Sequence, residues 1–290
     1  MYAQSAAAER GSWQHPDSRF AAIDVAVDDN DYAKAQKLLA ELRVEAKRAK
    51  STQLQAEVQE RGKEVTKLAR DFEKLAKHFK TLEKNGNDAK ASLAVGKYYC
   101  VAKGSWKEGL PLLAAGEDQK LAAIASEDND GLLQTDEQFA IADQWWQYAE
   151  KVSDASERIA YQLRARDWMM RARVGATEKQ RATIDQRLRQ VPFFPEKIVV
   201  WNTHNGDVND RGAEELLVSM LFQGAVVWKQ TTDIPWTANE PSYVLLRPKR
   251  VKADQVRVDI LKHHFRGGGL GEIEVIIGRT NIVAGCQVVA

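Results

Sequence analysis

Residues 202–210 crowd oxygen-bearing side chains into one short stretch, Asn-Thr-His-Asn-Gly-Asp-Val-Asn-Asp. Calcium takes roughly six to eight oxygen ligands from carboxylates, amides and backbone carbonyls. Asp207, Asn209 and Asp210, together with Glu272 from a later strand, are therefore candidate ligands of a structural calcium ion. The stretch does not follow the ligand spacing of an EF-hand. The alternative is an Asx-rich turn, in which Asn and Asp side chains bond their own backbone.

Several other polar and aromatic side chains could contact an organic ligand. Aromatic rings that are exposed at loop ends can stack on sugar rings, and neighbouring polar groups can then bind the hydroxyls. The candidate ligand-binding residues are Asn205, Asp210, Trp236, His264 and Arg266. The alternative for Trp236 is that it packs into the edge of its domain, since large aromatic side chains are usually mostly buried.

The signatures of common enzymes are missing from the sequence. It contains no nucleophile elbow, Walker loop or HExxH motif. His263 and His264 are adjacent in a segment expected to be a strand, so their side chains face opposite sides and do not share a metal ion. The glycines at 267–269 precede a strand and not a helix N-terminus, which argues against a phosphate cradle. We expect a protein that is not an enzyme and needs no cofactor other than calcium.

Composition limits the class of partner. The 290 residues include 42 Lys plus Arg and 41 Asp plus Glu, for a net charge of +1, whereas nucleic-acid-binding proteins usually have a basic excess. Two cysteines, Cys100 and Cys286, are too few for a disulfide framework. No apolar run reaches the roughly 20 residues of a membrane span.

The first residues do not form an intact signal peptide, because they lack a basic segment and an apolar core. The small and polar run at residues 2–6 could follow a signal that has been removed. An extracytoplasmic location, in the periplasm or at the cell surface, is therefore favoured.

The residues that precede the candidate site have helical periodicity. We expect a disordered tail over 1–16 and an α-helical domain over 17–190. The Asp and Asn residues at 28–31 break one helix and cap the next, and 51–85 predict one long helix with a charged outer face. Its near-heptad spacing also allows close pairing with a partner helix, although an ordinary packed helix is the simpler interpretation.

Small and aromatic residues between 89 and 172 follow a helix-turn-helix pattern. One unit contains Leu93, Gly96, Tyr99, Gly104, Trp106, Gly109 and Leu112, and a related unit contains Phe139, Ala142, Trp145, Trp146, Ala149, Tyr161, Ala165, Trp168 and Met169. These units resemble degenerate tetratricopeptide repeats, which stack into a solenoid. We expect the tryptophans at 145, 146 and 168 to lie in its core, and Gly96 to let two helices approach closely.

The pattern changes after residue 190. Residues 191–196 are rich in proline and aromatic residues and form a candidate linker. Alternating apolar segments then predict strands, which begin near residues 198, 216, 226, 243, 256, 273 and 282 and are separated by Gly, Pro and Asn turns. Short strands of this kind indicate an antiparallel β-sandwich or jelly roll over 197–290, so the chain is a multidomain α + β protein.

Residues 267–275 read Gly-Gly-Gly-Leu-Gly-Glu-Ile-Glu-Val. This segment resembles a strand of galactose-binding-like sandwiches, which include discoidin domains, coagulation-factor C-type domains and related carbohydrate-binding modules. With the upstream Asp-Gln-Trp-Trp-Gln-Tyr-Ala-Glu at 143–150, the arrangement is similar to that of large proteins of planctomycete-type bacteria. The order of oxygen donors in 205–210 differs from the discoidin-type calcium loop, Asp-Gly-Asp-x-x-Thr, so the resemblance does not by itself imply calcium.

These features together predict a non-catalytic protein that binds a carbohydrate or a cell-surface ligand through its C-terminal domain, displayed on a helical scaffold. The alternative is a protein-interaction scaffold, in which the groove of the helical repeats binds a protein partner.

Overall fold

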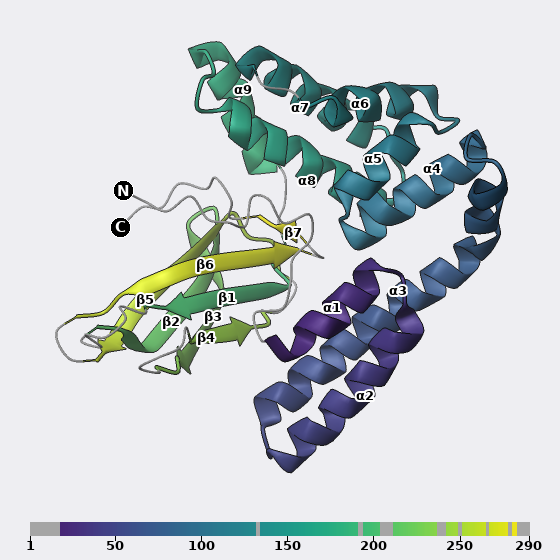
Figure 1. Ribbon diagram of the computed structural model, residues 1–290. Helices are drawn as coiled ribbons and strands as arrows, with labels where there is room; N and C mark the ends of the chain where they lie inside the picture. Colours follow the sequence, from purple (N-terminus) through teal and green to yellow (C-terminus); the bar gives the residue numbers. More distant parts are fainter. Residues whose placement is uncertain are drawn as a thin grey trace. The chain divides into compact units, whose positions relative to one another are not determined.

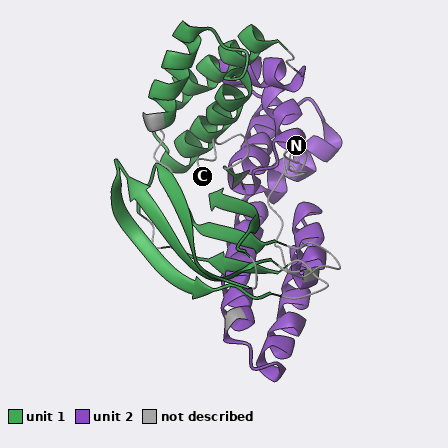
Figure 2. Ribbon diagram, turned by 90° about the vertical axis from the view of Figure 1, so that its left-hand side faces the viewer, with its two compact units in different colours: residues 1–10, 133–290 green, residues 11–132 purple. Residues whose placement is uncertain are grey.

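The computed structural model divides into two compact units (Figure 1, Figure 2). The residues that it describes are 18–131, 134–190, 194–203, 211–236, 242–248, 251–264, 267–277 and 280–282. One unit holds 18–131 and is helical, and the other holds the described residues from 134 onward, which include the strands. The chain is thus a mixed α + β protein with its helices first, as the sequence predicts. The expected tail and residues 191–193 of the expected linker lie outside the described residues.

The helical unit is a succession of helices in which each packs against the next. Its elements are the short 3-10 turn η2 (Ser18–Phe20), α1 (Ala21–Asp28), α2 (Tyr32–Arg48), α3 (Thr52–Lys84), α4 (Ala89–Lys97), the π-helical segment η3 (Tyr98–Lys103), α5 (Trp106–Ala114) and α6 (Gln119–Asn129).

Side-chain caps set the beginnings of several of these helices. Asp31, Ser51, Asp88 and Asp118 each accept a hydrogen bond from a backbone N–H group in the first turn, which satisfies a donor that the helix itself leaves unpaired. The predicted break at 28–31 and the predicted long helix at 51–85 are therefore confirmed.

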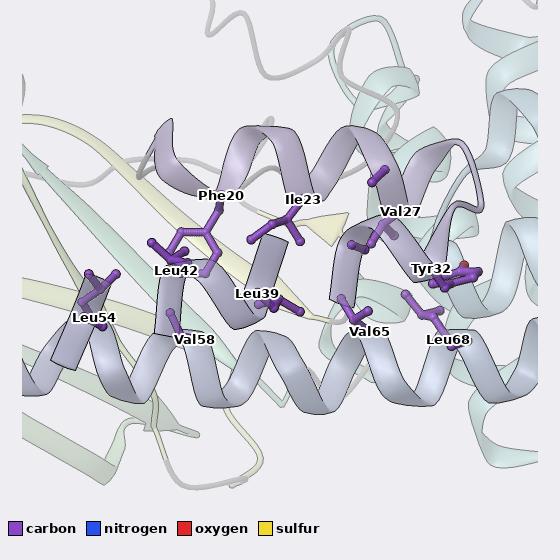
Figure 3. Close-up of a cluster of buried hydrophobic side chains, with 14 residues drawn as sticks. Phe20, Ile23, Val27, Tyr32, Leu39, Leu42, Leu54, Val58, Val65 and Leu68 are labelled. Carbon is purple, nitrogen blue, oxygen red and sulfur yellow. The ribbon is translucent and has the colours of Figure 1, made fainter. Parts of the chain in front are cut away.

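One hydrophobic core joins α1, α2 and α3 (Figure 3). The labelled side chains point toward one another from the three helices: Phe20, Ile23, Val27, Tyr32, Leu39, Leu42, Leu54, Val58, Val65 and Leu68. Farther along, a Cβ atom on Gly96 of α4 would lie 2.8 Å from the backbone nitrogen of Leu113 in α5. The glycine therefore permits the close approach of two helices that the sequence predicts.

Two cations are buried in this unit. Arg61, only 3% exposed, forms an ion pair with the equally buried Asp24 and donates a hydrogen bond to Glu64 over 2.9 Å. Burial lowers the pKa of the Arg61 guanidinium, but the two carboxylates outweigh this effect and the pKa is raised. Lys103 donates to the backbone carbonyls of residues 27 and 28 and to Asn30 Oδ1. Its charge therefore stabilises the C-terminal end of α1.

The second unit begins with α7 (Thr135–Ala149), α8 (Ala155–Ala172) and α9 (Glu178–Gln190). Trp145 of α7 is fully buried, and its ring stacks on Tyr161 of α8 with centroids 5.4 Å apart. Trp146 and Trp168 are also buried, so all three tryptophans occupy the core positions that their spacing predicts. Within the described residues, no helix has the length and apolar character needed to cross a membrane.

The strands of this unit form two antiparallel sheets (Figure 1). One sheet has the order β4 (Tyr243–Leu246), β1 (Lys197–Asn202), β6 (Leu270–Ile277) and β7 (Thr280–Asn281). The other has the order β3 (Ala225–Asp233), β2 (Ala213–Phe222) and β5 (Gln255–His263). The structure describes a short strand, β7, at Thr280–Asn281. Of the strand expected from residue 282 onward, only Ile282 is described, and residues 283–290 lie outside the described residues.

Both sheets contribute to a single hydrophobic core. Its buried members are Ile198, Val200, Ala213, Leu216, Val218, Met220, Ile234, Val244, Leu246 and Ala253. Alternate residues of β1 and β2 point into this core, as the period of two along a strand requires. Packing around this shared core holds the two sheets, and therefore the ends of their strands, in fixed positions relative to each other.

Candidate ligand-binding site

Three of the four connections between the two sheets lie at one end of the strands. They follow β1, β3 and β5 and lead into β2, β4 and β6. The register brings the end of β1 next to the beginnings of β4 and β6, and the beginning of β2 next to the ends of β3 and β5. We call this end of the sheets the loop end. The stretches that the sequence singles out around Asn205, Trp236 and His264 all belong to these connections.

Backbone hydrogen bonds hold the described parts of the connections together. Gly212 N donates to Gly267 O over 3.1 Å, and His264 N donates to Gly212 O over 2.9 Å. Asn202 N donates to Ser242 O over 2.8 Å. Each bond joins residues that are distant in sequence, so the loop end is organised by the packing of the two sheets.

The buried side chain of Asn202 links backbone segments at the loop end by hydrogen bonds. Its Nδ2 donates to Ala213 O over 2.8 Å and to Pro235 O over 3.1 Å, and its Oδ1 accepts from Ala213 N and Thr203 N over 2.8 and 3.0 Å. The side chain is only 3% exposed, and both of its donors and both acceptor positions of Oδ1 are in use. Asn202 therefore joins three segments of backbone and is not available as a calcium ligand.

Trp236 rests on the backbone at Gly212. A Cβ atom at position 212 would lie 2.6 Å from Trp236 Cδ1, a distance that side chains do not tolerate. Trp236 Nε1 also donates a hydrogen bond to Arg211 O over 3.2 Å. Because Gly212 has no side chain, the indole ring can lie against the backbone just before β2, and the hydrogen bond to Arg211 O fixes its orientation.

Trp236 and His264 are brought together by the fold. Their ring centroids lie 5.2 Å apart with the planes tilted by 34°, and both side chains are partly exposed. Two of the expected ligand-binding residues, from different connections, are thus neighbours. The pair offers an aromatic face beside an imidazole that can donate or accept a hydrogen bond.

A second aromatic pair lies at the same end of β1 and was missed by the sequence analysis. The rings of Trp201 and Tyr243 have centroids 5.2 Å apart, and Trp201 Nε1 donates to Glu274 Oε1 over 2.8 Å. The pairing of β1 with β4 and β6 creates this cluster. The only sequence signal was an aromatic residue next to the polar stretch, which does not reveal its partners.

The other expected site residues are placed as follows. Asn205, Asp207, Asn209, Asp210 and Arg266 lie outside the described residues. Glu272 is exposed on β6, in register with Trp201.

Glu272 does not share a site with Asn202. The Asn202 side chain is buried between the sheets, whereas that of Glu272 is exposed. Within the described part of the chain, no cluster of three or more His, Cys, Asp or Glu side chains could hold a metal ion. The calcium site therefore stays a prediction that concerns residues 205–210.

Charged groups flank the loop end on the three-stranded sheet. Lys262 of β5 donates to Glu215 of β2 over 2.8 Å, next to the pairing of Ala213 with His263. The hydrogen bond and the charge of Glu215 raise the pKa of the Lys262 ammonium group, with smaller contributions from Glu214 and Asp233. Lys262 is therefore positively charged beside the site at neutral pH.

Comparisons with protein families, with curated proteins and with solved structures found no match to the chain.

Proposed function

We propose that this is a non-catalytic binding protein that holds a carbohydrate at the loop end. In this proposal the two sheets form a galactose-binding-like β-sandwich or jelly roll, and the helices form a tetratricopeptide-like scaffold. The observation that carries it is the partly exposed Trp236 ring, fixed by Gly212 and packed against His264.

The chemistry of this pair suits a sugar. A pyranose has an apolar face of C–H groups and a rim of hydroxyl groups. The C–H face can stack on an indole ring, while an imidazole beside it can bind a hydroxyl. Trp236 is already oriented by its hydrogen bond to Arg211 O, so little side-chain entropy is lost when a ligand stacks on it.

The position of the pair also supports a binding role. Ligand-binding residues often lie on connections that a rigid scaffold positions, and here the scaffold is the shared core of two sheets. Asn205, Asp210 and Arg266 belong to the same connections and would supply further polar contacts in this proposal.

A glycan array probed with the full-length chain tests the proposal. We expect binding to one class of glycan, and we expect Trp236→Ala to weaken its Kd about tenfold, which corresponds to about 1.4 kcal/mol of lost stacking. Trp201→Ala is the matched control: it also removes an indole near the end of β1, but from the pair with Tyr243, and should leave the Kd unchanged.

The outcomes separate the alternatives clearly. If no glycan is bound, or if Trp236→Ala binds as tightly as the wild type, the proposal is wrong. If Trp201→Ala alone weakens binding, carbohydrate binds the chain at the Trp201–Tyr243 pair and the assignment to Trp236 is wrong.

A further inference from the structure

The helical unit carries a groove between two helices that lie side by side, α2 and α3 (Figure 1). Its volume is about 660 Å³. The lining residues are Gln36, Leu39, Ala40, Arg43, Gln59, Gly62, Lys63, Thr66, Lys67 and Arg70. They recur every three or four positions on each helix, so one face of α2 and one face of α3 form the two walls. We call this feature the α2–α3 groove.

The walls of the α2–α3 groove are basic. Arg43, Lys63, Lys67 and Arg70 line it, and none of the described lining residues is acidic. All four side chains are exposed. The net charge of the whole chain, +1, conceals this local concentration of positive charge.

The carboxylates of α3 neutralise only part of this charge. Glu64 pairs with the buried Arg61, Asp71 pairs with Lys74, and Glu60 pairs with Lys63. Among the residues that the structure describes, Arg43, Lys67 and Arg70 have no carboxylate partner. The groove therefore keeps at least three uncompensated cations on one face.

Three small residues, Ala40, Gly62 and Thr66, are among those that line the groove. Gly62 lies in the middle of α3, where glycine costs about 1 kcal/mol relative to alanine. Packing does not require it, because the nearest atom to a Cβ there would be Arg43 Nη2 at 3.6 Å, an ordinary contact. With Ala40 and Thr66, Gly62 leaves room for the backbone of a partner to approach the two helices.

We infer that the α2–α3 groove binds an acidic helical segment of a partner protein. Lys63, Lys67 and Arg70 follow one another at four and three positions, a rise of about 6 and 4.5 Å along α3. Carboxylates at the same spacing on a partner helix would face all three side chains. Lys67 and Arg70 have no carboxylate partner within the described residues, whereas Lys63 also pairs with Glu60. From Gln59 to Arg70 the groove extends about 16 Å, or about three helical turns.

This surface belongs to a different unit from the loop end, so its test is independent of carbohydrate binding. The probe is a fluorescein-labelled, alanine-based helical peptide with glutamates at the spacing of Lys63, Lys67 and Arg70. The control peptide has the same composition with the glutamates distributed around the helix. Anisotropy titrations with the full-length chain should show the first peptide binding at least tenfold more tightly, with an affinity that falls as salt rises.

Matched variants locate the binding. Arg43→Glu combined with Arg70→Glu should weaken binding of the first peptide by tenfold or more, because two ion pairs become repulsions. Lys80→Glu combined with Lys90→Glu makes the same change in net charge with exposed residues outside the groove, and should have no effect. Gly62→Leu places a large side chain in the groove and has a higher helix propensity than glycine, so it should abolish binding without unfolding α3.

Three results would overturn the inference. They are no binding of the first peptide at low salt, equal binding of the two peptides, and equal losses in the groove and control variants. Tighter binding of single-stranded RNA than of the peptide would assign the groove to nucleic acid and would also overturn it.

Discussion

Gly212→Ala tests whether the loop end has the geometry on which carbohydrate binding depends. The new Cβ atom would lie 2.6 Å from Trp236 Cδ1 and 2.9 Å from Trp236 Nε1, so the indole must move by about 1 Å to reach a normal contact distance. This movement breaks the hydrogen bond to Arg211 O, worth about 1 kcal/mol, and the ring contact with His264, worth about 1 kcal/mol. We expect the stability of the sheets to fall by about 2 kcal/mol.

The same substitution in a Trp236→Ala background is the decisive control. With the indole gone, the closest of the remaining atoms is Asn202 Oδ1 at 3.3 Å, which a small shift relieves. The cost of Gly212→Ala should then fall below about 0.5 kcal/mol, so that the double-mutant cycle shows a strong coupling of the two residues.

Hydrogen exchange of the full-length chain can measure both costs, because peptides from β2 and β5 report the opening of the sheets and peptides from α1 to α3 provide an internal reference. We expect exchange in β2 and β5 to accelerate about thirtyfold in Gly212→Ala and less than about threefold when it is added to Trp236→Ala. Equal acceleration in the two backgrounds would show that Trp236 does not rest on residue 212, and the reasoning for the site would be wrong.

Four further predictions concern other parts of the chain. Asp24→Asn should destabilise the helical unit by about 3 kcal/mol, seen in hydrogen exchange of α1 and α3, because the charge of Arg61 loses its buried partner; a change below about 0.5 kcal/mol would contradict this. Trp145→Ala should cost about 3–5 kcal/mol in urea unfolding, and a near-neutral result would mean that this side chain is exposed. Gly62→Ala should raise the stability of the helical unit by about 1 kcal/mol in the same assay, and a loss would show an undetected packing role. Finally, calcium at a hundredfold excess over its Kd should stabilise the chain by about 2.7 kcal/mol in thermal unfolding. Asp207→Ala should abolish this effect. Equal unfolding midpoints with calcium and with chelator would support the Asx-rich turn at 205–210 instead.

Local patterns predicted the secondary structure well. The cap at Asp31 and the long helix α3 were expected because their signals, a capping side chain and a stripe of apolar residues every three or four positions, act within a few residues. Turns at Gly residues were likewise expected between the strands, and Gly224 joins β2 to β3 with a φ of 80°. The short strand β7 was not expected, because its two residues are set by pairing with β6 and not by local alternation.

The candidate site was predicted only in part. Trp236 and His264 were both candidate ligand-binding residues, and the structure places their rings 5.2 Å apart. Asn202 begins the oxygen-rich stretch at 202–210, but its donors and acceptor are used by backbone groups of three segments. No sequence pattern shows which distant backbone groups the Asn202 side chain will bond, so its role in linking these segments could not be predicted.

The helices, most of the strands and their order follow from local patterns, since propensity, capping and hydrophobic period are properties of neighbouring residues. Tertiary packing brought three connections to one end of the sheets, because strand pairing joins residues far apart in the chain. It likewise decided that Trp201 faces Tyr243 and that the cations of α2 and α3 line one groove. A binding surface needs side chains from several segments at fixed distances, and those distances exist only once the cores have formed.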